Sequence, residues 1–196
     1  CKQNEIELYN QSSRVNFYAR QRIVEFVDTD YVKKTEFKTD SFAVRIQGVN
    51  LEAPRNFCLK VMPAEGYEAS PELQLADKYT FSALDTVCQT YYYRVKRPEL
   101  KRGNKAFGCL VAFDQTNPNH QFDKGLVELN QMLVNVRWQL RPYNWDEGDW
   151  GEYSDAKYIY MMDVLGKDYS QLTYDDFDTV SKAYEAYLAA GKPAIV

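Results

Sequence analysis

The chain has 196 residues, and its 24 Lys and Arg residues against 28 Asp and Glu residues give a formal net charge of −4. With no basic excess to release counterions from a phosphate backbone, the composition argues against nucleic-acid binding as the main task. The hydrophobic share of 45% is too high for a disordered protein, and the length fits one large domain or one domain with an appendage. A single histidine excludes most His-based catalysis and most His-ligated metal sites.

The first segment, residues 1–13, begins with a cysteine and has little apolar pattern. A chain that opens on cysteine is typical of a bacterial lipoprotein, in which acyl chains on that residue anchor a soluble domain. We therefore expect residues 1–13 to form a lipid-anchored tether with Cys1 as the lipidation site; the alternative is a sequence boundary that falls on cysteine by chance. Cys58, Cys88 and Cys109 lie in apolar or alternating runs and are expected to be buried free thiols.

The next part of the chain, residues 14–142, alternates apolar and polar residues, which is the pattern of strands with one buried face. The alternating runs lie at residues 15–19, 23–27, 42–46, 57–61, 89–95, 107–113 and 132–140. No helical stretch is expected between them, whereas a parallel sheet would need crossover helices. The pattern predicts a mainly β protein with an antiparallel, immunoglobulin-like β-sandwich over residues 14–142.

The pattern changes after Pro142. An aromatic loop is followed by two predicted helices, one capped by Ser154 and the other beginning at Thr173, with Asp176 three residues on as in a capping box. The second helix has an apolar stripe that is expected to be buried and consists of Phe177, Val180, Tyr184, Tyr187 and Leu188. Because two short helices cannot bury their own stripes, we expect residues 143–196 to form an aromatic loop and a helical cap packed on the sandwich.

Two segments at this junction carry a family resemblance. They are Arg141-Pro142-Tyr143-Asn144-Trp145 and Trp150-Gly151-Glu152-Tyr153-Ser154-Asp155-Ala156-Lys157-Tyr158. With the terminal cysteine and the predicted sandwich, they resemble a family of uncharacterised Bacteroidetes lipoproteins; the run Ala76-Asp77-Lys78-Tyr79 is similar to a weaker feature of that family but lacks the preceding glycine. Members are often encoded near the outer-membrane importers and glycan-binding lipoproteins of polysaccharide-utilisation loci. The resemblance implies an outer-membrane lipoprotein, on the periplasmic or the surface face, and supplies no catalytic residues.

The aromatic loop is the positive functional clue. An aromatic ring can stack on the apolar face of a sugar while a nearby carboxylate accepts its hydroxyl groups. The candidate glycan-binding residues are Tyr143, Trp145, Asp149, Trp150 and Tyr153. The alternative is that the tryptophans clamp the helical tail onto the sandwich. A glycan-binding site should leave at least two of the rings exposed and nearly coplanar in a groove, whereas a structural role should bury them.

The sequence predicts a non-catalytic cell-envelope protein that binds a glycan or a component of a polysaccharide-uptake system. The expected partners are a polysaccharide or oligosaccharide, outer-membrane importer components and the membrane through the lipid on Cys1, with no nucleic acid. One alternative is a structural or interaction subunit without its own ligand. The least favoured is a glycoside hydrolase using the carboxylates of Asp146, Glu147, Asp149 or Glu152, because sequence spacing cannot place two of them across a cleft. No catalytic residue, metal site or cofactor is predicted; His120 lies in a turn-rich stretch, and the acidic loop does not match a helix–loop–helix calcium motif.

Overall fold

The computed structural model describes residues 13–48, 50–84, 86–100 and 106–191. The chain divides into two compact units: unit 1 takes its residues from Cys1–Val24, Phe37–Lys96 and Phe107–Val136, and unit 2 from Glu25–Glu36, Arg97–Ala106 and Arg137–Val196. Cys1 and nearly all of the predicted tether lie outside the described residues, so the lipidation site stays a prediction. The sequence did not indicate that Glu25–Glu36 and Arg97–Ala106 would cluster with the C-terminal part of the chain.

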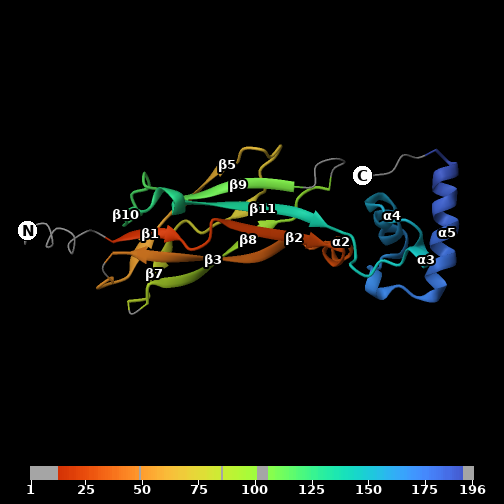
Figure 1. The fold of residues 1–196 in the computed structure, drawn as a ribbon, viewed down its shortest axis with the longest axis horizontal. Helices are drawn as coiled ribbons and strands as arrows, with labels where there is room; N and C mark the ends of the chain where they lie inside the picture. Colours follow the sequence, from red (N-terminus) through yellow and green to blue (C-terminus); the bar gives the residue numbers. More distant parts are fainter. Residues whose placement is uncertain (1–12, 49, 85, 101–105, 192–196) are drawn as a thin grey trace, which may run out of the picture. The chain divides into compact units, whose positions relative to one another are not determined.

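Unit 1 is built from strands in three sheets (Figure 1). The five-stranded sheet has the order β10 (Asp123–Lys124), β1 (Arg14–Phe17), β3 (Phe37–Gln47), β8 (Cys88–Lys96) and β6 (Leu73–Gln74). The four-stranded sheet has the order β2 (Gln21–Val27), β11 (Gln131–Gln139), β9 (Ala106–Phe113) and β5 (Leu59–Pro63), and the last residues of β2 and β11 belong to unit 2. The third sheet pairs β4 (Arg55–Phe57) with β7 (Tyr79–Phe81).

The pairing is antiparallel at β1–β3, β3–β8, β6–β8, β4–β7 and β5–β9. The prediction of an entirely antiparallel sandwich is wrong at β1 and β10, which pair in parallel. Their contact is made across a long stretch of sequence, and a short strand arriving by such a connection is not held to the antiparallel direction of a hairpin.

The alternation that predicted the strands matches the burial of their side chains. In β8, Tyr91, Tyr93 and Val95 are buried, whereas Tyr92 is 65% exposed. Phe17 of β1 stacks on Phe113 of β9 with ring centroids 4.4 Å apart, so the five-stranded and four-stranded sheets pack through their apolar faces. The prediction of a mainly β protein is confirmed.

The helices α2 (Asp28–Lys33), α3 (Glu147–Trp150), α4 (Asp155–Leu165) and α5 (Tyr174–Ala189) lie in unit 2, with the 3₁₀ turn η2 (Tyr169–Gln171); the 3₁₀ turn η1 (Val127–Leu129) lies in unit 1. The two predicted helices are confirmed as α4 and α5, and the side chain of Ser154 accepts a hydrogen bond from the Lys157 N–H at 3.1 Å. The expectations of no helix among the strands and of only two helices in the C-terminal part are wrong at α2 and α3. Helices of six and four residues are too short to display a 3.6-residue period.

The three described cysteines are free thiols. Cys58 and Cys109 are buried as predicted, and burial raises the pKa of Cys109 to about 11. Cys88 is exposed, contrary to the prediction, because the strand register places it opposite Arg45 on the outward face of β8. Within the described residues, no helix has the length and apolar character needed to cross a membrane.

Candidate functional site

The loop that the sequence predicted as a site is organised around Asp146. Its carboxylate accepts hydrogen bonds from the N–H groups of Gly148 at 2.8 Å and Asp149 at 3.1 Å, and so caps the short helix α3. Gly151 follows α3 with a φ of 78°, a backbone conformation that favours glycine. The cap and the glycine together fix the positions of Asp149 and Trp150 at the end of α3.

Trp145 and Tyr153 are held by structural contacts and are half-buried. The indole N–H of Trp145 donates to the carbonyl of Gly151 at 2.9 Å, and the ring stacks on Tyr169 with centroids 5.4 Å apart. Tyr153 meets Trp145 edge-on at 81° and donates its hydroxyl to Asp155 at 2.6 Å. These two rings therefore do not form the exposed, coplanar pair expected of a glycan platform; they close the loop instead.

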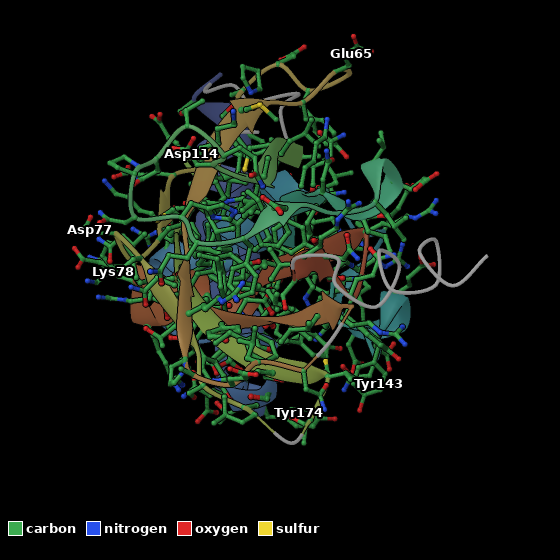
Figure 2. All side chains as sticks on the ribbon, turned by 90° about the vertical axis from the view of Figure 1, so that its left-hand side faces the viewer. Glu65, Asp77, Lys78, Asp114, Tyr143 and Tyr174 are labelled. Atoms are coloured by element: carbon green, nitrogen blue, oxygen red, sulfur yellow. The ribbon has the colours of Figure 1, made fainter. Side chains whose placement is uncertain are left out.

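Tyr143 is fully exposed, as is Tyr174 (Figure 2). It borders a hollow of about 490 Å³ whose lining includes Asp28, Arg141 and Asp168. Tyr143 is not among the described residues that line the aromatic groove at Trp150, so the five predicted candidates do not form one site.

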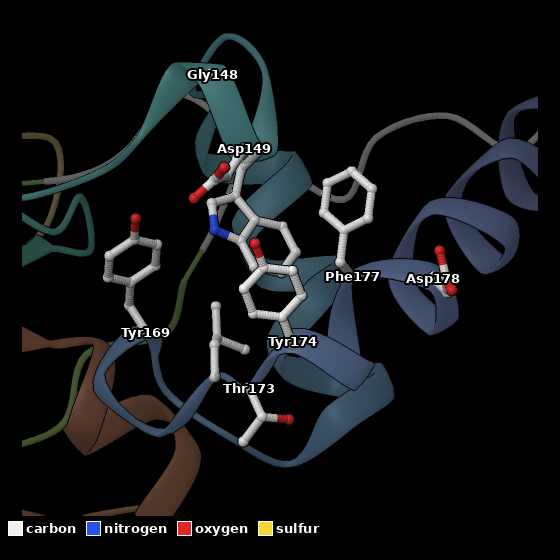
Figure 3. A pocket seen from close by; sticks show the side chains of 9 residues that line it. Gly148, Asp149, Tyr169, Thr173, Tyr174, Phe177 and Asp178 are labelled. Carbon is white, nitrogen blue, oxygen red and sulfur yellow. The ribbon is translucent and has the colours of Figure 1, made fainter.

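An aromatic groove of about 600 Å³ lies at α3, η2 and the start of α5 (Figure 3). Asp149 and Trp150 line it, as predicted, beside the fully exposed Tyr174 and the 42%-exposed Phe177. The ring centroids of Trp150 and Phe177 are 5.5 Å apart at an angle of 56°. The other lining residues are Gly148, Tyr169, Leu172, Thr173 and Asp178. The volume falls within the range of about 300–1,000 Å³ that small-ligand sites occupy.

The polar groups of the groove are mainly acidic. Asp149 comes from α3 and Asp178 from α5, and both are exposed. Neither carboxylate accepts a hydrogen bond from another described residue, and no lysine or arginine is found among the described residues that line the groove. The groove therefore presents aromatic surface together with two hydrogen-bond acceptors that carry negative charge.

The wall formed by Tyr169 is held by a hydrogen-bonded network. The buried hydroxyl of Tyr158 donates to Asp28 at 2.7 Å and accepts from the N–H of Tyr169 at 2.7 Å. Burial, reinforced by the Asp28 carboxylate, raises the pKa of Tyr158 well above its ordinary value. The hydroxyl of Tyr169 in turn accepts from the N–H of Asp146 at 2.9 Å and donates to the carbonyl of Asn144 at 3.2 Å. Because this network fixes Tyr169, the wall that it forms is preorganised for a ligand.

The start of α5, which forms the opposite wall, is fixed by its cap. Asp176 accepts hydrogen bonds from the N–H of Thr173 at 2.7 Å and from its hydroxyl at 3.0 Å, in the predicted capping box. Lys167 pairs with Asp176 at 3.1 Å. The Thr173 N–H and then the Lys167 ammonium lower the pKa of the Asp176 carboxyl. This cap holds Tyr174 and Phe177 in the first turns of α5.

Sequence reasoning missed Tyr169, Tyr174 and Phe177 as site residues. The predicted buried stripe of the second helix is confirmed at Val180, which is 3% exposed, but wrong at Phe177 and Leu188, which are exposed. The reason is that the stripe extends beyond the covered part of α5 at both ends. The available signal was the pair Tyr174 and Phe177, two large rings three residues apart at the start of a helix.

Apart from Asp149, the residues considered for catalysis lie outside the groove or take part in structural hydrogen bonds. His120 belongs to unit 1, where its Nδ1 accepts a hydrogen bond from the N–H of Cys58 at 3.0 Å, and burial lowers its pKa. Asp146 is occupied as the helix cap, and Glu147 and Glu152 are exposed and do not line the groove among its described residues. Across the described part of the chain, no group of three or more His, Cys, Asp and Glu side chains is arranged to hold a metal ion.

No protein-family model and no curated protein matches this sequence. Among solved structures, the chain is similar to the apo form of the Calx CBD1 domain, with 8% identity, a TM-score of 0.42, and coverage of 66% of this chain and 99% of that one. It is also similar to a Bacteroides ovatus ATCC 8483 protein described as a candidate carbohydrate-binding protein, with 14% identity, a TM-score of 0.43, and coverage of 63% of this chain and 36% of that one. A third is the periplasmic chaperone SfaE, with 13% identity, a TM-score of 0.35, and coverage of 64% and 59%. Since all three likenesses are distant, the functional argument rests on the groove itself.

Proposed function

We propose that this protein is a non-catalytic carbohydrate-binding protein and that the aromatic groove of unit 2 is its binding site. The observation that carries the proposal is the combination of aromatic rings and unengaged carboxylates in one groove, where the exposed Tyr174 and Phe177 and the half-buried Trp150 lie beside Asp149. The C–H face of a pyranose ring packs on an aromatic ring, and its hydroxyl groups donate to carboxylates. Because hydroxyl groups need acceptors, the acidic rim suits a sugar better than a purely apolar ligand.

The contacts that hold the aromatic loop in place support this use of the groove's rings. The hydrogen bonds of Trp145, Tyr153 and Tyr158 hold the segment in place, and the half-buried ring of Trp150 lies against Phe177 in the groove. Tyr174 is fully exposed at the start of a helix, where a large ring gains little from the fold. These features favour a ligand site over the alternative of a structural clamp.

The test is a calorimetric titration of the protein with a panel of plant, host and microbial polysaccharides. We expect saturable binding of at least one glycan, and a loss of affinity of at least tenfold, or about 1.4 kcal/mol, in Trp150→Ala and in Phe177→Ala. Tyr143→Ala is the matched control, because it removes a fully exposed aromatic ring outside the groove and should bind normally. Reducing ends should not accumulate during incubation with the bound glycan.

A null result is also informative. If no glycan binds, or if Tyr143→Ala weakens binding as much as Trp150→Ala does, the groove is not a carbohydrate site. The alternative of an interaction subunit without its own ligand would then take its place. Release of reducing ends would instead favour a glycoside hydrolase, which is the least favoured alternative from the sequence.

We also propose, from the family resemblance, that the protein works in the cell envelope beside outer-membrane importer components and is anchored by a lipid on Cys1. From the strand pattern, we further propose that the strands of residues 14–142 are connected as in an immunoglobulin-like sandwich. Metabolic labelling of the full-length native protein with a fatty-acid analogue, compared with a Cys1→Ser variant, tests the anchor. Co-purification from solubilised outer membranes tests the importer partners.

A further inference from the structure

We propose that the aromatic groove selects glycans by charge, and that it prefers oligosaccharides carrying amino groups and rejects those carrying carboxylates. The inference rests on the proposed function, because it names the class of glycan for the same site. The charges that line and surround the groove support this preference.

The two segments that supply most of the groove are strongly acidic. Residues 146–150 and 173–178 contain six carboxylates and no lysine or arginine. The six are Asp146, Glu147, Asp149, Asp175, Asp176 and Asp178. Two of them, Asp149 and Asp178, line the groove and are seen with the rings in Figure 3. A ligand therefore meets negative charge from both α3 and α5.

Two of the lysines that lie close to these segments are already engaged, and a third, Lys182 in α5, is exposed and does not line the groove among its described residues. Lys157 donates to the backbone carbonyl of Trp150 and lies over the ring of Tyr184, 5.8 Å from its centroid. Lys167 is paired with Asp176, with nitrogen and oxygen 3.1 Å apart. Neither ammonium is among the described groove-lining groups that could pair with an anionic sugar.

Charge and aromatic surface act together on a cationic ligand. An ammonium group on a sugar ring can form a charge-assisted hydrogen bond to a carboxylate such as Asp149, and these bonds are stronger than neutral ones. The faces of Trp150, Tyr174 and Phe177 attract cations through their ring quadrupoles. A carboxylated sugar would instead bring like charges together, and within about 8 Å salt at physiological strength screens that repulsion incompletely.

The experiment compares three β-1,4-linked pyranose tetramers of equal length, made of glucose, glucosamine and a uronic acid. Calorimetry is run on the full protein at about pH 5.5, where Asp carboxylates are ionised and the sugar amino groups are protonated. We expect the glucosamine tetramer to bind about tenfold more tightly than the glucose tetramer, and the uronate tetramer at least about tenfold more weakly. The preference should shrink at high salt, because exposed charges are then screened.

Variants that remove the carboxylate charges separate the contribution of the carboxylates to binding from that of the rings. In the double variant Asp149→Asn with Asp178→Asn, the affinity for the amino-sugar tetramer should fall to within about threefold of that for the neutral tetramer, because the negative charge is removed while an amide oxygen remains to accept sugar hydroxyl groups. Glu185→Gln is the matched control, since Glu185 is an exposed carboxylate of α5 that does not line the described groove, and it should leave the preference intact. Trp150→Ala should weaken all three tetramers.

Each contrary result has a distinct meaning. Equal binding of the three tetramers, or a preference that survives the double variant, overturns the charge selection but leaves carbohydrate binding in place. Failure of the glucosamine tetramer to bind, when a polysaccharide of the panel does bind, has the same consequence. Failure of every glycan overturns the proposed function as well. Tighter binding of a tetralysine peptide than of the glucosamine tetramer would replace the amino sugar with a basic protein partner.

Discussion

Unit 1 and unit 2 differ in the main use that they make of aromatic residues. In unit 1, Phe57 is fully buried and packs against Tyr79, Tyr91 and Phe113, with ring centroids 4.9 to 5.8 Å apart. The tyrosine hydroxyls there reach mostly backbone carbonyls, as that of Tyr91 does at 2.9 Å to Thr80. These rings form the hydrophobic core, and their polar ends are satisfied at its border.

In unit 2, the hydroxyls of three tyrosines bind carboxylates, whereas those of Tyr160 and Tyr169 donate to backbone carbonyls, and some of the rings stay open to solvent. Tyr31 donates to Asp163 at 2.7 Å and Tyr158 donates to Asp28 at 2.7 Å, whereas Tyr174 is fully exposed. All three tryptophans, Trp138, Trp145 and Trp150, also belong to this unit. The comparison teaches that a high tyrosine content has two separate causes here: a packed core in one unit, and a polar network that supports a groove in the other.

The largest expected effect comes from breaking the core of unit 1. Phe57→Ala removes a fully buried ring and should lower the free energy of unfolding by about 3–5 kcal/mol. Urea unfolding followed by far-ultraviolet circular dichroism measures the loss. Since the tryptophans lie in unit 2, their fluorescence in the same samples shows whether the damage stays in unit 1. A loss below about 1 kcal/mol would contradict the role of Phe57 as a core residue.

A smaller loss is expected from the network of unit 2. Tyr158→Phe keeps the ring but removes the hydroxyl that joins Asp28 to the N–H of Tyr169, which should cost about 2 kcal/mol because a charged acceptor and a backbone donor lose their partner. Tryptophan fluorescence during urea unfolding gives the value. The matched control is Tyr143→Phe, whose hydroxyl belongs to a fully exposed side chain and whose loss should change stability by less than about 0.5 kcal/mol. Equal losses in the two variants would refute the network.

The fold could be predicted where a long pattern repeats. Alternation over residues 132–140 and 107–113 predicted β11 and β9, and the capping signals at Ser154 and Thr173 predicted α4 and α5. The very short strands β6 and β10 could not be found, because two residues show no period and their pairing depends on partners far away in the sequence.

The site could be predicted only in part, for a related reason. Asp149 and Trp150 were identified because an acidic, aromatic loop has an unusual local composition. Phe177 was assigned to a buried stripe, since helical spacing tells which residues share a face but not how far a neighbouring element covers it. Tyr143 and Trp150 lie seven positions apart, and nothing in their spacing shows that one borders a different hollow from the other.

The smallest expected effect is a pH dependence of unit 1 that arises from the one histidine of the chain, which lies in this unit. Burial lowers the pKa of His120 in the folded protein, against an opposing influence of Asp114, so the folded state disfavours the protonated ring. The Nδ1 atom accepts the Cys58 N–H at 3.0 Å, and a proton there would remove the acceptor. The stabilisation is therefore complete above the unfolded pKa of about 6.5 and is lost as the pH falls through the lower folded value.

The measurement for this prediction is urea unfolding, followed by circular dichroism, of the native protein and of His120→Gln at about pH 8 and pH 5. Glutamine keeps a hydrogen-bond acceptor but does not titrate, so the native protein should lose more stability on acidification than the variant. Titration of carboxylates such as Asp40, whose pKa is lowered by Arg22 and Tyr93 against the effect of its burial, is common to both proteins and cancels in the difference. Identical losses would show that the imidazole is not held neutral by the fold, and the acid sensitivity of unit 1 would then belong to its carboxylates alone.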